Sequence, residues 1–430
     1  MTRLTSNSSS AGISSKHSMR VSKISRGEPV ARPMRRKSPG RRGDPPGRPC
    51  GAQRRSTYRC LVYLSIALLL TGCGLGSERL TTITTDGTAW PTYRSNLESN
   101  ARIETGAPLR IETQLWESKT GGVACGEPVV RDGYVFFPGC DRRIEVYNAL
   151  TGEREFRNRF DGPVAGVVAH DSLFVFVTDQ NQRKVYVYSR NPVKELWSAR
   201  IPISQCPPRL LDDGSLLVAT LHGRLMRMTP DSDVVWDVRT PGQIHAPPAV
   251  HDSFVVVPSG RVLSTRRLSD GSELWSHQTS GAVMATPAID DRVYVGSTDS
   301  LLYAVDLETG RMDWFFATNG QLLTTPAIGD SIVYLAANDR NIYALNKRTG
   351  KLIWSYETGG PANQSPTLAG NILFVATTSE QLLLLDAASG DLVREFPLTA
   401  PAVTAPVIAH NRVYVADQRR RLLCFGPNDQ

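Results

Sequence analysis

The chain has 430 residues and a formal net charge of +8, but this charge is unevenly distributed. Residues 1–59 contain 15 lysines and arginines against two acidic residues, Glu28 and Asp44. The remainder of the chain is therefore net negative, and its charge does not point to a nucleic-acid-binding protein. The length would allow two or three average domains, although one repeated unit accounts for most of it.

An apolar run follows the basic stretch at Leu61–Leu70. It is too short for a mature membrane-spanning helix but has the length of the apolar region of a signal peptide. It ends in Leu-Thr-Gly-Cys73, which resembles a bacterial lipobox. The resemblance implies cleavage before Cys73, acylation of this cysteine, and a final place at the outer membrane because residue 74 is Gly74 rather than aspartate. The alternative is an ordinary cysteine after an uncleaved anchor.

Residues 1–72 are therefore predicted to be a basic leader and lipoprotein signal peptide. This leader is unusually long, so Met19 or Met34 is an alternative start. Residues 73–110 are rich in Ser, Thr and Asn and are predicted to form a tether. Within them, TAWPTYRSNLESN (residues 88–100) contains a tryptophan, a tyrosine and an arginine that are costly to leave in a flexible linker. We expect this piece to lie against the folded domain.

A unit of about forty residues recurs from near residue 115 to the C-terminus. Such a period is typical of an array of stacked structural units. Its clearest copies are AVDLETGRMDW (Ala304–Trp314) and ALNKRTGKLIW (Ala344–Trp354). Units of this length cannot bury their own apolar faces and must stack on their neighbours. Two marker positions count the units. The first reads Trp116, Phe156, Trp197, Trp236, Trp275, Trp314, Trp354 and Arg394, and the second reads Pro128, Gly166, Pro208, Pro248, Pro287, Pro326, Pro366 and Pro406.

Short runs of β-branched and aromatic residues lie between the markers, for example Val293–Thr298 and Val413–Gln418. They are bounded by Asp, Gly or Asn, which is typical of antiparallel strands. Four such strands in each of eight units predict an all-β, eight-bladed β-propeller over residues 111–430. The last unit stops before its aromatic position, whereas Trp116 precedes the first complete unit. The N-terminal strand around Trp116 is therefore predicted to complete the eighth blade and close the ring.

The Thr-Gly-x-x-x-Trp element predicts a tight turn followed by an aromatic side chain between blades. Asp306, Thr309 and Gly310 can form the turn, since Asp and Thr bond the local backbone and Gly tolerates positive φ. Each aromatic ring would then lie between its own blade and the next, burying on the order of 200 Å². These blade-docking residues are structural: Trp116, Phe156, Trp197, Trp236, Trp275, Trp314 and Trp354.

Two cysteines of the first unit, Cys125 and Cys140, are predicted to face each other across neighbouring strands. An exported protein meets an oxidising compartment that permits a disulfide there, and two free thiols are the equally weighted alternative. Cys206 and Cys424 fall in other blades and are not expected to meet.

Three soft ligands, Cys206, His245 and Met284, occupy matching positions near one mouth of the expected channel. Such side chains around a ring could bind copper or haem. The simpler interpretation is that they are mouth residues of different sizes, and the histidines show no metal-ligand spacing.

The AxDxxTGxxxW copies and the TPAI elements at Thr286 and Thr325 resemble the pyrroloquinoline-quinone (PQQ) type of repeat over residues 112–430. Two groups share this repeat: the quinoprotein dehydrogenases, and the BamB group of outer-membrane assembly lipoproteins, which bind no quinone. WPTYR at Trp90–Arg94 also resembles the opening of many BamB-like repeat proteins.

The dehydrogenases are longer and hold the quinone with a vicinal cysteine pair, a Glu/Asn/Asp calcium cluster and a catalytic aspartate. This sequence has no adjacent cysteines and no long insertions. The BamB resemblance therefore implies a monomeric, non-enzymatic scaffold without a cofactor, lipid-anchored at the periplasmic face of the outer membrane, whose partner is the barrel-assembly complex. The alternative is an oxidoreductase that uses PQQ with calcium, or a sensor of a small ligand.

A rigid ring presents its turns on two faces, and such turns suit protein partners. Turns on one face carry charged residues, and the alternative is that most of them form a solvated rim. The predicted partner-facing residues are Asp299, Asp339, Arg340, Arg419 and Arg420.

Overall fold

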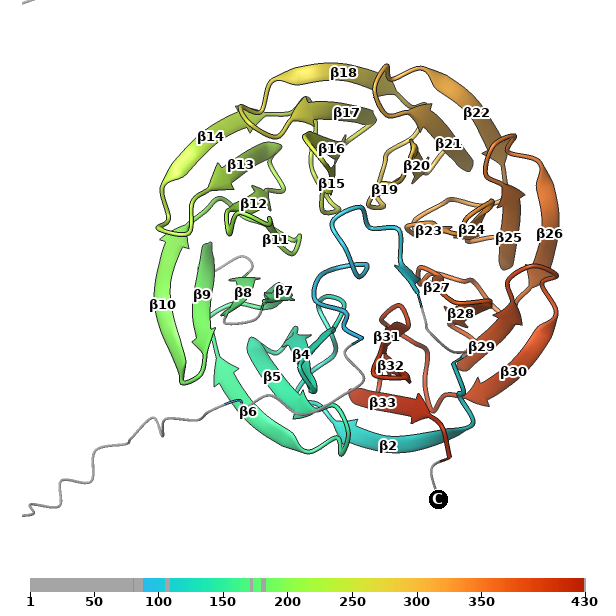
Figure 1. Cartoon of the computed structure of the whole chain (residues 1–430), viewed down its shortest axis with the longest axis horizontal. Helices are drawn as coiled ribbons and strands as arrows, with labels where there is room; N and C mark the ends of the chain where they lie inside the picture. The colour runs from blue at the N-terminus through green and yellow to red at the C-terminus, as the bar shows by residue number, and fades with distance from the viewer. Residues whose placement is uncertain (1–79, 81–87, 105–108, 171–172, 179–182, 429–430) are drawn as a thin grey trace, which may run out of the picture. The chain divides into compact units, whose positions relative to one another are not determined.

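The computed structural model describes residues 80, 88–104, 109–170, 173–178 and 183–428, which belong to one unit, Thr71–Gln430. Every regular element among them is a β-strand, and the strands form eight sheets in a ring around a central opening (Figure 1). The predicted eight-bladed β-propeller is confirmed. Within these residues there is no helix of the length and apolar character needed to cross a bilayer. The predicted leader and the proposed anchor, Cys73, lie outside the described residues.

Each blade runs from an inner strand beside the opening to an outer strand at the rim, and blades are numbered in chain order. Blade 1 contains β3 (Val129–Arg131), β4 (Tyr134–Gly139), β5 (Arg143–Asn148) and β6 (Arg154–Arg159), and blade 2 contains β7 (Val164–Ala169), β8 (Leu173–Thr178), β9 (Lys184–Arg190) and β10 (Val193–Arg200). Blade 3 contains β11 (Arg209–Leu210), β12 (Leu216–Ala219), β13 (Arg224–Met228) and β14 (Val234–Arg239), and blade 4 contains β15 (Ala249–His251), β16 (Phe254–Ser259), β17 (Val262–Arg267) and β18 (Glu273–Gln278).

The second half of the ring repeats this plan. Blade 5 contains β19 (Ala288–Ile289), β20 (Arg292–Gly296), β21 (Leu301–Asp306) and β22 (Met312–Ala317), and blade 6 contains β23 (Ala327–Ile328), β24 (Ile332–Ala336), β25 (Asn341–Asn346) and β26 (Leu352–Glu357). Blade 7 contains β27 (Thr367–Ala369), β28 (Ile372–Ala376), β29 (Gln381–Asp386) and β30 (Leu392–Pro397), and blade 8 contains β31 (Val407–Ala409), β32 (Arg412–Ala416), β33 (Arg421–Gly426) and β2 (Thr113–Lys119). A two-residue strand, β1 (Arg102–Ile103), pairs in parallel with β27.

Strand β2 closes the ring as predicted, because it pairs antiparallel with β33 and places Trp116 opposite Cys424. The two ends of the folded chain therefore share one sheet. Joining them removes the open edge that an incomplete blade would leave.

Burial follows from the stacking of blades. The two middle strands of a blade are covered on both faces, so strands such as β21 are buried over Leu302–Val305 and read as continuous apolar runs. Outer strands such as β22 have one solvent-facing side and alternate in burial, with Trp314 buried. In every blade a β-bulge lies just before the aromatic marker position. A bulge bends the strand and interrupts an otherwise regular edge.

The tryptophans dock each blade on the following one. The indole N–H of Trp314 donates to the backbone oxygen of Lys347, at 3.2 Å, and its ring lies against Gly350 in the same turn. The same donation recurs from Trp116 to Ala149, Trp236 to Leu268, Trp275 to Leu307 and Trp354 to Ala387. Two members of the predicted set differ: Phe156 has no indole N–H to donate, and the indole N–H of Trp197 donates to no described residue.

Turns of two kinds give the ring two distinct faces. The first face carries the turns between the second and third strands of each blade, together with the connections between blades. The second face carries the turns between the first and second strands and between the third and fourth. These two names are used below.

Residues 88–104, here called the axial segment, lie in the central opening of the ring (Figure 1). Trp90 pairs with Val130 of blade 1 through two backbone hydrogen bonds of 2.7 and 2.8 Å. Backbone oxygens of the segment then accept an inner-strand amide from each of five further blades. These donors are Ala169, Val250, Ile289, Ile328 and Leu368, at 2.8 to 3.0 Å. Gly370 of blade 7 donates a second amide from that blade to Ile103 at 3.2 Å.

The two remaining blades are also reached. Blade 3 contributes the side chain of Arg209, and in blade 8 the amide of His410 donates to Thr88 Oγ1. An inner strand has no neighbouring strand on the side that faces the axis. Its backbone amides on that side therefore need partners from elsewhere. The axial segment supplies such partners to the inner strands of blades 1, 2, 4, 5, 6 and 7.

The prediction of a tether over residues 73–110 is therefore wrong for residues 88–104. Their composition is polar, but their main chain is hydrogen-bonded and the side chains of Trp90, Arg94 and Ser99 have no exposed surface. The expectation that residues 88–100 lie against the folded domain is confirmed.

Candidate functional site

A cluster of buried charges lies where the axial segment meets the inner strands. Trp90 Nε1 donates to Glu127 Oε1 at 2.6 Å, and the backbone amide of Arg94 donates to the same oxygen at 3.2 Å. The guanidinium of Arg94 donates to the backbone oxygen of Pro366 in blade 7. One short peptide thus connects blade 1 with blade 7, the two neighbours of blade 8.

Arg209 holds the other side of the axial segment. Its Nε donates to the backbone oxygen of Pro248 at 2.8 Å, and its Nη1 donates to that of Tyr93 at 2.7 Å. Its Nη2 donates to Ser99 Oγ, and the guanidinium lies 5.5 Å from the centre of the Tyr93 ring. Two buried arginines and one buried carboxylate therefore fix the segment, and burial lowers the pKa of both guanidiniums.

Burial raises the pKa of Glu127 above its ordinary value of 4.5, although Arg94 and the hydrogen bond from Trp90 pull it down. The folded state then binds this proton more tightly than the unfolded state does. The free energy of unfolding should therefore fall as the pH rises from 4.5 through the folded-state pKa, with a limiting slope of about 1.4 kcal/mol per pH unit. We expect Glu127→Gln to lack this component, as measured by urea unfolding of both proteins at several pH values. Parallel pH profiles for the two proteins would contradict the assignment.

Most polar groups of the cluster bond within it, although Nε and Nη1 of Arg94 have no hydrogen-bond partner among the described residues. Its carboxylate accepts two hydrogen bonds, and its arginines donate to backbone oxygens and a serine. It is best described as the fastening of the axial segment.

Cys125 and Cys140, the pair considered in the sequence, form a disulfide. Two backbone hydrogen bonds accompany it, from Cys125 N to Pro138 O and from Cys140 N to Val123 O, both 2.9 Å. The bond lies at the first face of blade 1 and braces the turn that follows Cys140. Cys206 and Cys424 are separate buried thiols.

We expect the double substitution Cys125→Ser with Cys140→Ser to lower the free energy of unfolding by about 3 kcal/mol, because a loop of this size is no longer closed in the unfolded chain. Reductant should lower the unfolding midpoint of the native chain to that of the double variant. It should leave the midpoint of the double variant unchanged. A native chain insensitive to reductant at its midpoint would contradict the expected contribution.

Two of the soft-ligand positions, Cys206 and His245, have other environments in the structure. Cys206 is buried, and burial raises the pKa of its thiol to about 12, which disfavours the thiolate that a metal would require. His245 Nε2 instead lies 3.1 Å from Gln243 Oε1. In the described part of the chain no three His, Cys, Asp or Glu side chains are grouped so as to hold a metal ion.

Two of the predicted partner-facing residues build their own turns. Asp299 accepts from Tyr303 Oη and the amides of Gly281 and Leu301; burial raises its pKa, but these hydrogen bonds outweigh it and hold the pKa below the ordinary value. Asp339 likewise accepts from Tyr343 Oη at 2.8 Å. Arg340, Arg419 and Arg420, by contrast, are exposed at the tips of first-face turns.

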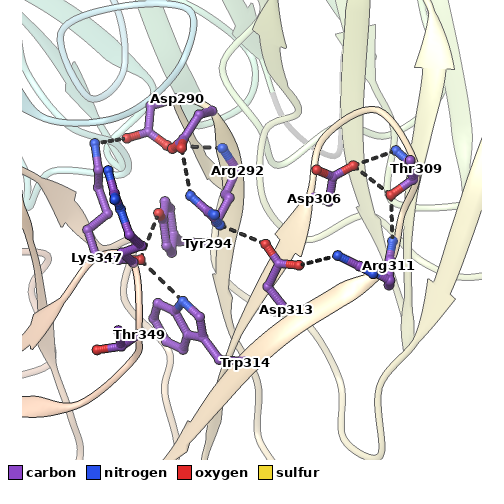
Figure 2. A network of polar contacts seen from close by, with 12 residues as sticks. Asp290, Arg292, Tyr294, Asp306, Thr309, Arg311, Asp313, Trp314, Lys347 and Thr349 are labelled. Carbon is purple, nitrogen blue, oxygen red and sulfur yellow. Dashed lines mark hydrogen bonds and ion pairs between the residues drawn. The ribbon is translucent and has the colours of Figure 1, made fainter.

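A network of ion pairs that the sequence did not suggest lies on the second face between blades 5 and 6 (Figure 2). Lys347 Nζ lies 2.7 Å from Asp290 Oδ2, and Arg292 pairs with Asp291 at 2.6 Å and Asp313 at 2.8 Å. A groove of about 480 Å³ beside them is lined by both signs of charge. The pair of Lys347 with Asp290 joins blade 6 to blade 5, whereas both pairs of Arg292 lie within blade 5. With both signs of charge present, the groove does not favour one class of ligand.

Comparison with known proteins addresses the family. The family model for the outer membrane protein assembly factor BamB matches residues 182–289 and 269–425, which together exceed half of the chain. No curated protein matches the sequence.

Solved structures share the fold at low identity. BamB from Moraxella catarrhalis is 16% identical with a TM-score of 0.63, over 73% of this chain and 99% of that one. A quinohemoprotein alcohol dehydrogenase from Comamonas testosteroni is 12% identical with a TM-score of 0.67, over 80% and 81% of the two chains. The computationally designed Ika8 protein is 18% identical with a TM-score of 0.65, over 73% and 100%. These likenesses show the propeller alone, whereas the family match shows that the chain belongs to the family of the outer membrane protein assembly factor BamB.

Proposed function

We propose that this chain is a non-enzymatic scaffold that assists the assembly of outer-membrane β-barrel proteins through protein–protein contacts. In this proposal it is attached by an acylated Cys73 to the periplasmic face of the outer membrane. The observation that carries the proposal is the match to the BamB family over residues 182–425.

The geometry supports a scaffold. The inner strands are hydrogen-bonded to the axial segment, and Trp90 and Arg94 of this segment are fully buried. The exposed turns of a rigid ring remain available for a partner, and such turns present fixed side chains at low entropic cost.

The alternative of a quinoprotein oxidoreductase draws on the fold shared with alcohol dehydrogenases. A calcium-bound quinone needs a group of oxygen ligands that converge on the metal. Across the described residues no three acidic, histidine or cysteine side chains are grouped in this way. The disulfide of blade 1 joins cysteines fifteen residues apart and is not the vicinal cysteine pair of the dehydrogenases. Among the described residues, this lack of converging acidic side chains favours the scaffold over the quinoprotein in our proposal.

The test is recovery of the full-length chain from a Gram-negative host with its membrane partners. We expect the barrel-assembly protein to co-purify with it, and a palmitate analogue to label the native chain but not Cys73→Ala. Recovery without any assembly component would overturn the partner. Dye-linked alcohol oxidation after addition of PQQ and calcium would overturn the non-enzymatic assignment.

A further inference from the structure

Like-charged residues face each other across strands in one half of the ring. The first residue of the third strand lies opposite the last residue of the fourth strand in every blade, at the first face. In the adjacent blades 8, 1, 2 and 3 both residues are cations: Arg421 and Lys119, Arg143 and Arg159, Lys184 and Arg200, Arg224 and Arg239. The same position in blades 4 to 7 holds Val262 and Gln278, Leu301 and Ala317, Asn341 and Glu357, Gln381 and Pro397.

Directly opposed like charges destabilise a sheet, so their restriction to four neighbouring blades calls for a reason other than folding. One cation of each pair is compensated within its own blade. Arg143 pairs with Asp141 at 2.8 Å, Arg421 with Glu117 at 2.6 Å, and Arg224 with Asp237. Lys184 lies 5.5 Å from the centre of the Tyr186 ring.

The other member of each pair points outward without such compensation. All four are exposed, and none forms an ion pair with any residue that the structure describes. They are Lys119, Arg159, Arg200 and Arg239.

Arginines at the turn tips add to the same rim. The backbone oxygens of Arg142, Arg183 and Arg420 accept the amides of Phe160, Ile201 and Thr120, which directly follow outer strands, at 2.7 to 2.9 Å. Each tip therefore lies beside an outward cation. These three arginines have φ values of 70°, 50° and 63°, a conformation in which glycine costs less. Glycine occupies the matching position in blade 3, at Gly223, and an arginine also occupies it in blade 6, at Arg340. This rim is therefore set apart by the outward cations, to which the tip arginines add.

We propose that this rim, the basic arc, is a docking surface for an acidic segment of a protein partner. The basic arc comprises Lys119, Arg142, Arg159, Arg183, Arg200, Arg239 and Arg420. The proposal rests on the proposed scaffold function and specifies the chemistry of its partner. Six of these seven side chains are arginines, whose planar guanidinium matches a carboxylate with two parallel hydrogen bonds.

A lipid surface fits the basic arc less well. Binding to a membrane surface usually adds buried apolar side chains to the attraction between charges. The exposed large apolar residues of blades 1 to 3 are Leu150, Leu196, Val234 and Val235, which lie in a second-face turn or on outer strands away from the first face. The disulfide in blade 1 further braces the turn of Arg142, as suits a preformed protein-docking surface.

The test compares two variants that lose equal charge. The arc variant carries Lys119→Gln, Arg159→Gln, Arg200→Gln and Arg239→Gln. The control variant carries substitutions of four exposed cations on or near the second face: Arg267→Gln, Arg311→Gln, Arg348→Gln and Lys351→Gln. Binding of a fluorescent polyglutamate peptide to the full-length chain is measured by anisotropy at low and at physiological salt. Matching unfolding midpoints show that both variants are folded.

We expect the arc variant to bind the peptide about tenfold more weakly, since each exposed ion pair contributes little alone, and the control to stay within about twofold of the native chain. Equal losses in both variants would mean unspecific attraction and overturn the proposal. An unchanged peptide affinity in the arc variant, with binding to phosphatidylglycerol vesicles lost instead, would replace the acidic segment by an anionic lipid surface.

Recovery of the assembly complex separates this proposal from the scaffold function. If the native chain recovers no assembly component while the peptide result holds, the proposed function fails and the basic arc stands. If native chain and arc variant recover the complex equally well, the basic arc fails and the function stands.

Discussion

Replacement of Trp90 by alanine is expected to lower the free energy of unfolding by about 4 kcal/mol, the range found when a large buried aromatic side chain is removed. Trp90 has no exposed surface and its Nε1 donates to Glu127 at 2.6 Å. The substitution leaves a cavity and also removes a hydrogen bond from a buried carboxylate, which adds to the loss. Urea unfolding of native and substituted chains measures the difference.

The same variant tests whether the axial segment acts as a unit. Amides of Val250, Ile289, Ile328 and Leu368 donate to the segment, so loosening it should expose them to solvent together. We expect hydrogen exchange at these four amides to accelerate in Trp90→Ala, while the middle strands of the same blades stay protected. Trp90→Phe keeps most of the packing but not the indole N–H. Its exchange rates at these amides should lie between those of the native chain and those of Trp90→Ala. Acceleration spread evenly over whole blades would show that the segment does not open separately.

The ring could be predicted because each blade needs the same few residues at the same spacing. Gly310 and Gly350 must adopt positive φ in a turn against a preceding tryptophan, and Trp275 and Trp314 must reach that turn from the outer strand. Such requirements repeat with the blade and therefore appear as a period in the sequence.

The axial segment was only partly predicted because its main partners are backbone amides. An amide such as that of Ile289 leaves no trace in the side-chain pattern. Two departures from the repeat did carry a signal. Glu127 stands where other blades have Thr286 or Thr325, and Arg209 stands where blade 4 has Ala249. Buried charged residues on or just before an inner strand require a partner, and the axial segment provides it.

The basic arc was missed for a related reason. Arg419 and Arg420 could be recognised as a run of charge, but the opposed cations are far apart in sequence and meet only through the register of the strands. Asp299 and Asp339, which were expected to face a partner, accept amides of their own turns, those of Leu301 and Asn341. They also accept amides of the neighbouring connections between blades. Acidic residues in short turns often serve this local role.

Replacement of Gly350 by alanine is the second change with a large expected effect, because it tests the contact between blades 5 and 6. Gly350 has φ +69°, and an added Cβ would lie 2.5 Å from Trp314 Cε3 and 2.6 Å from Cδ2. The indole cannot easily retreat, since its N–H is held by the backbone oxygen of Lys347 at 3.2 Å. Overpacking together with the unfavourable φ should lower the free energy of unfolding by about 3 kcal/mol.

Gly214→Ala provides the matched control, because it carries the backbone cost without the aromatic contact. Gly214 has φ +78°, but its added Cβ would meet only Pro230 Cγ, at 3.3 Å. This variant should lose about 1 kcal/mol. In a Trp314→Leu background, where the crowding is relieved, Gly350→Ala should cost no more than Gly214→Ala does. If the two glycine variants are equally destabilised in the native background, the stacked tryptophan is not what fixes the turn, and backbone conformation alone explains the glycine.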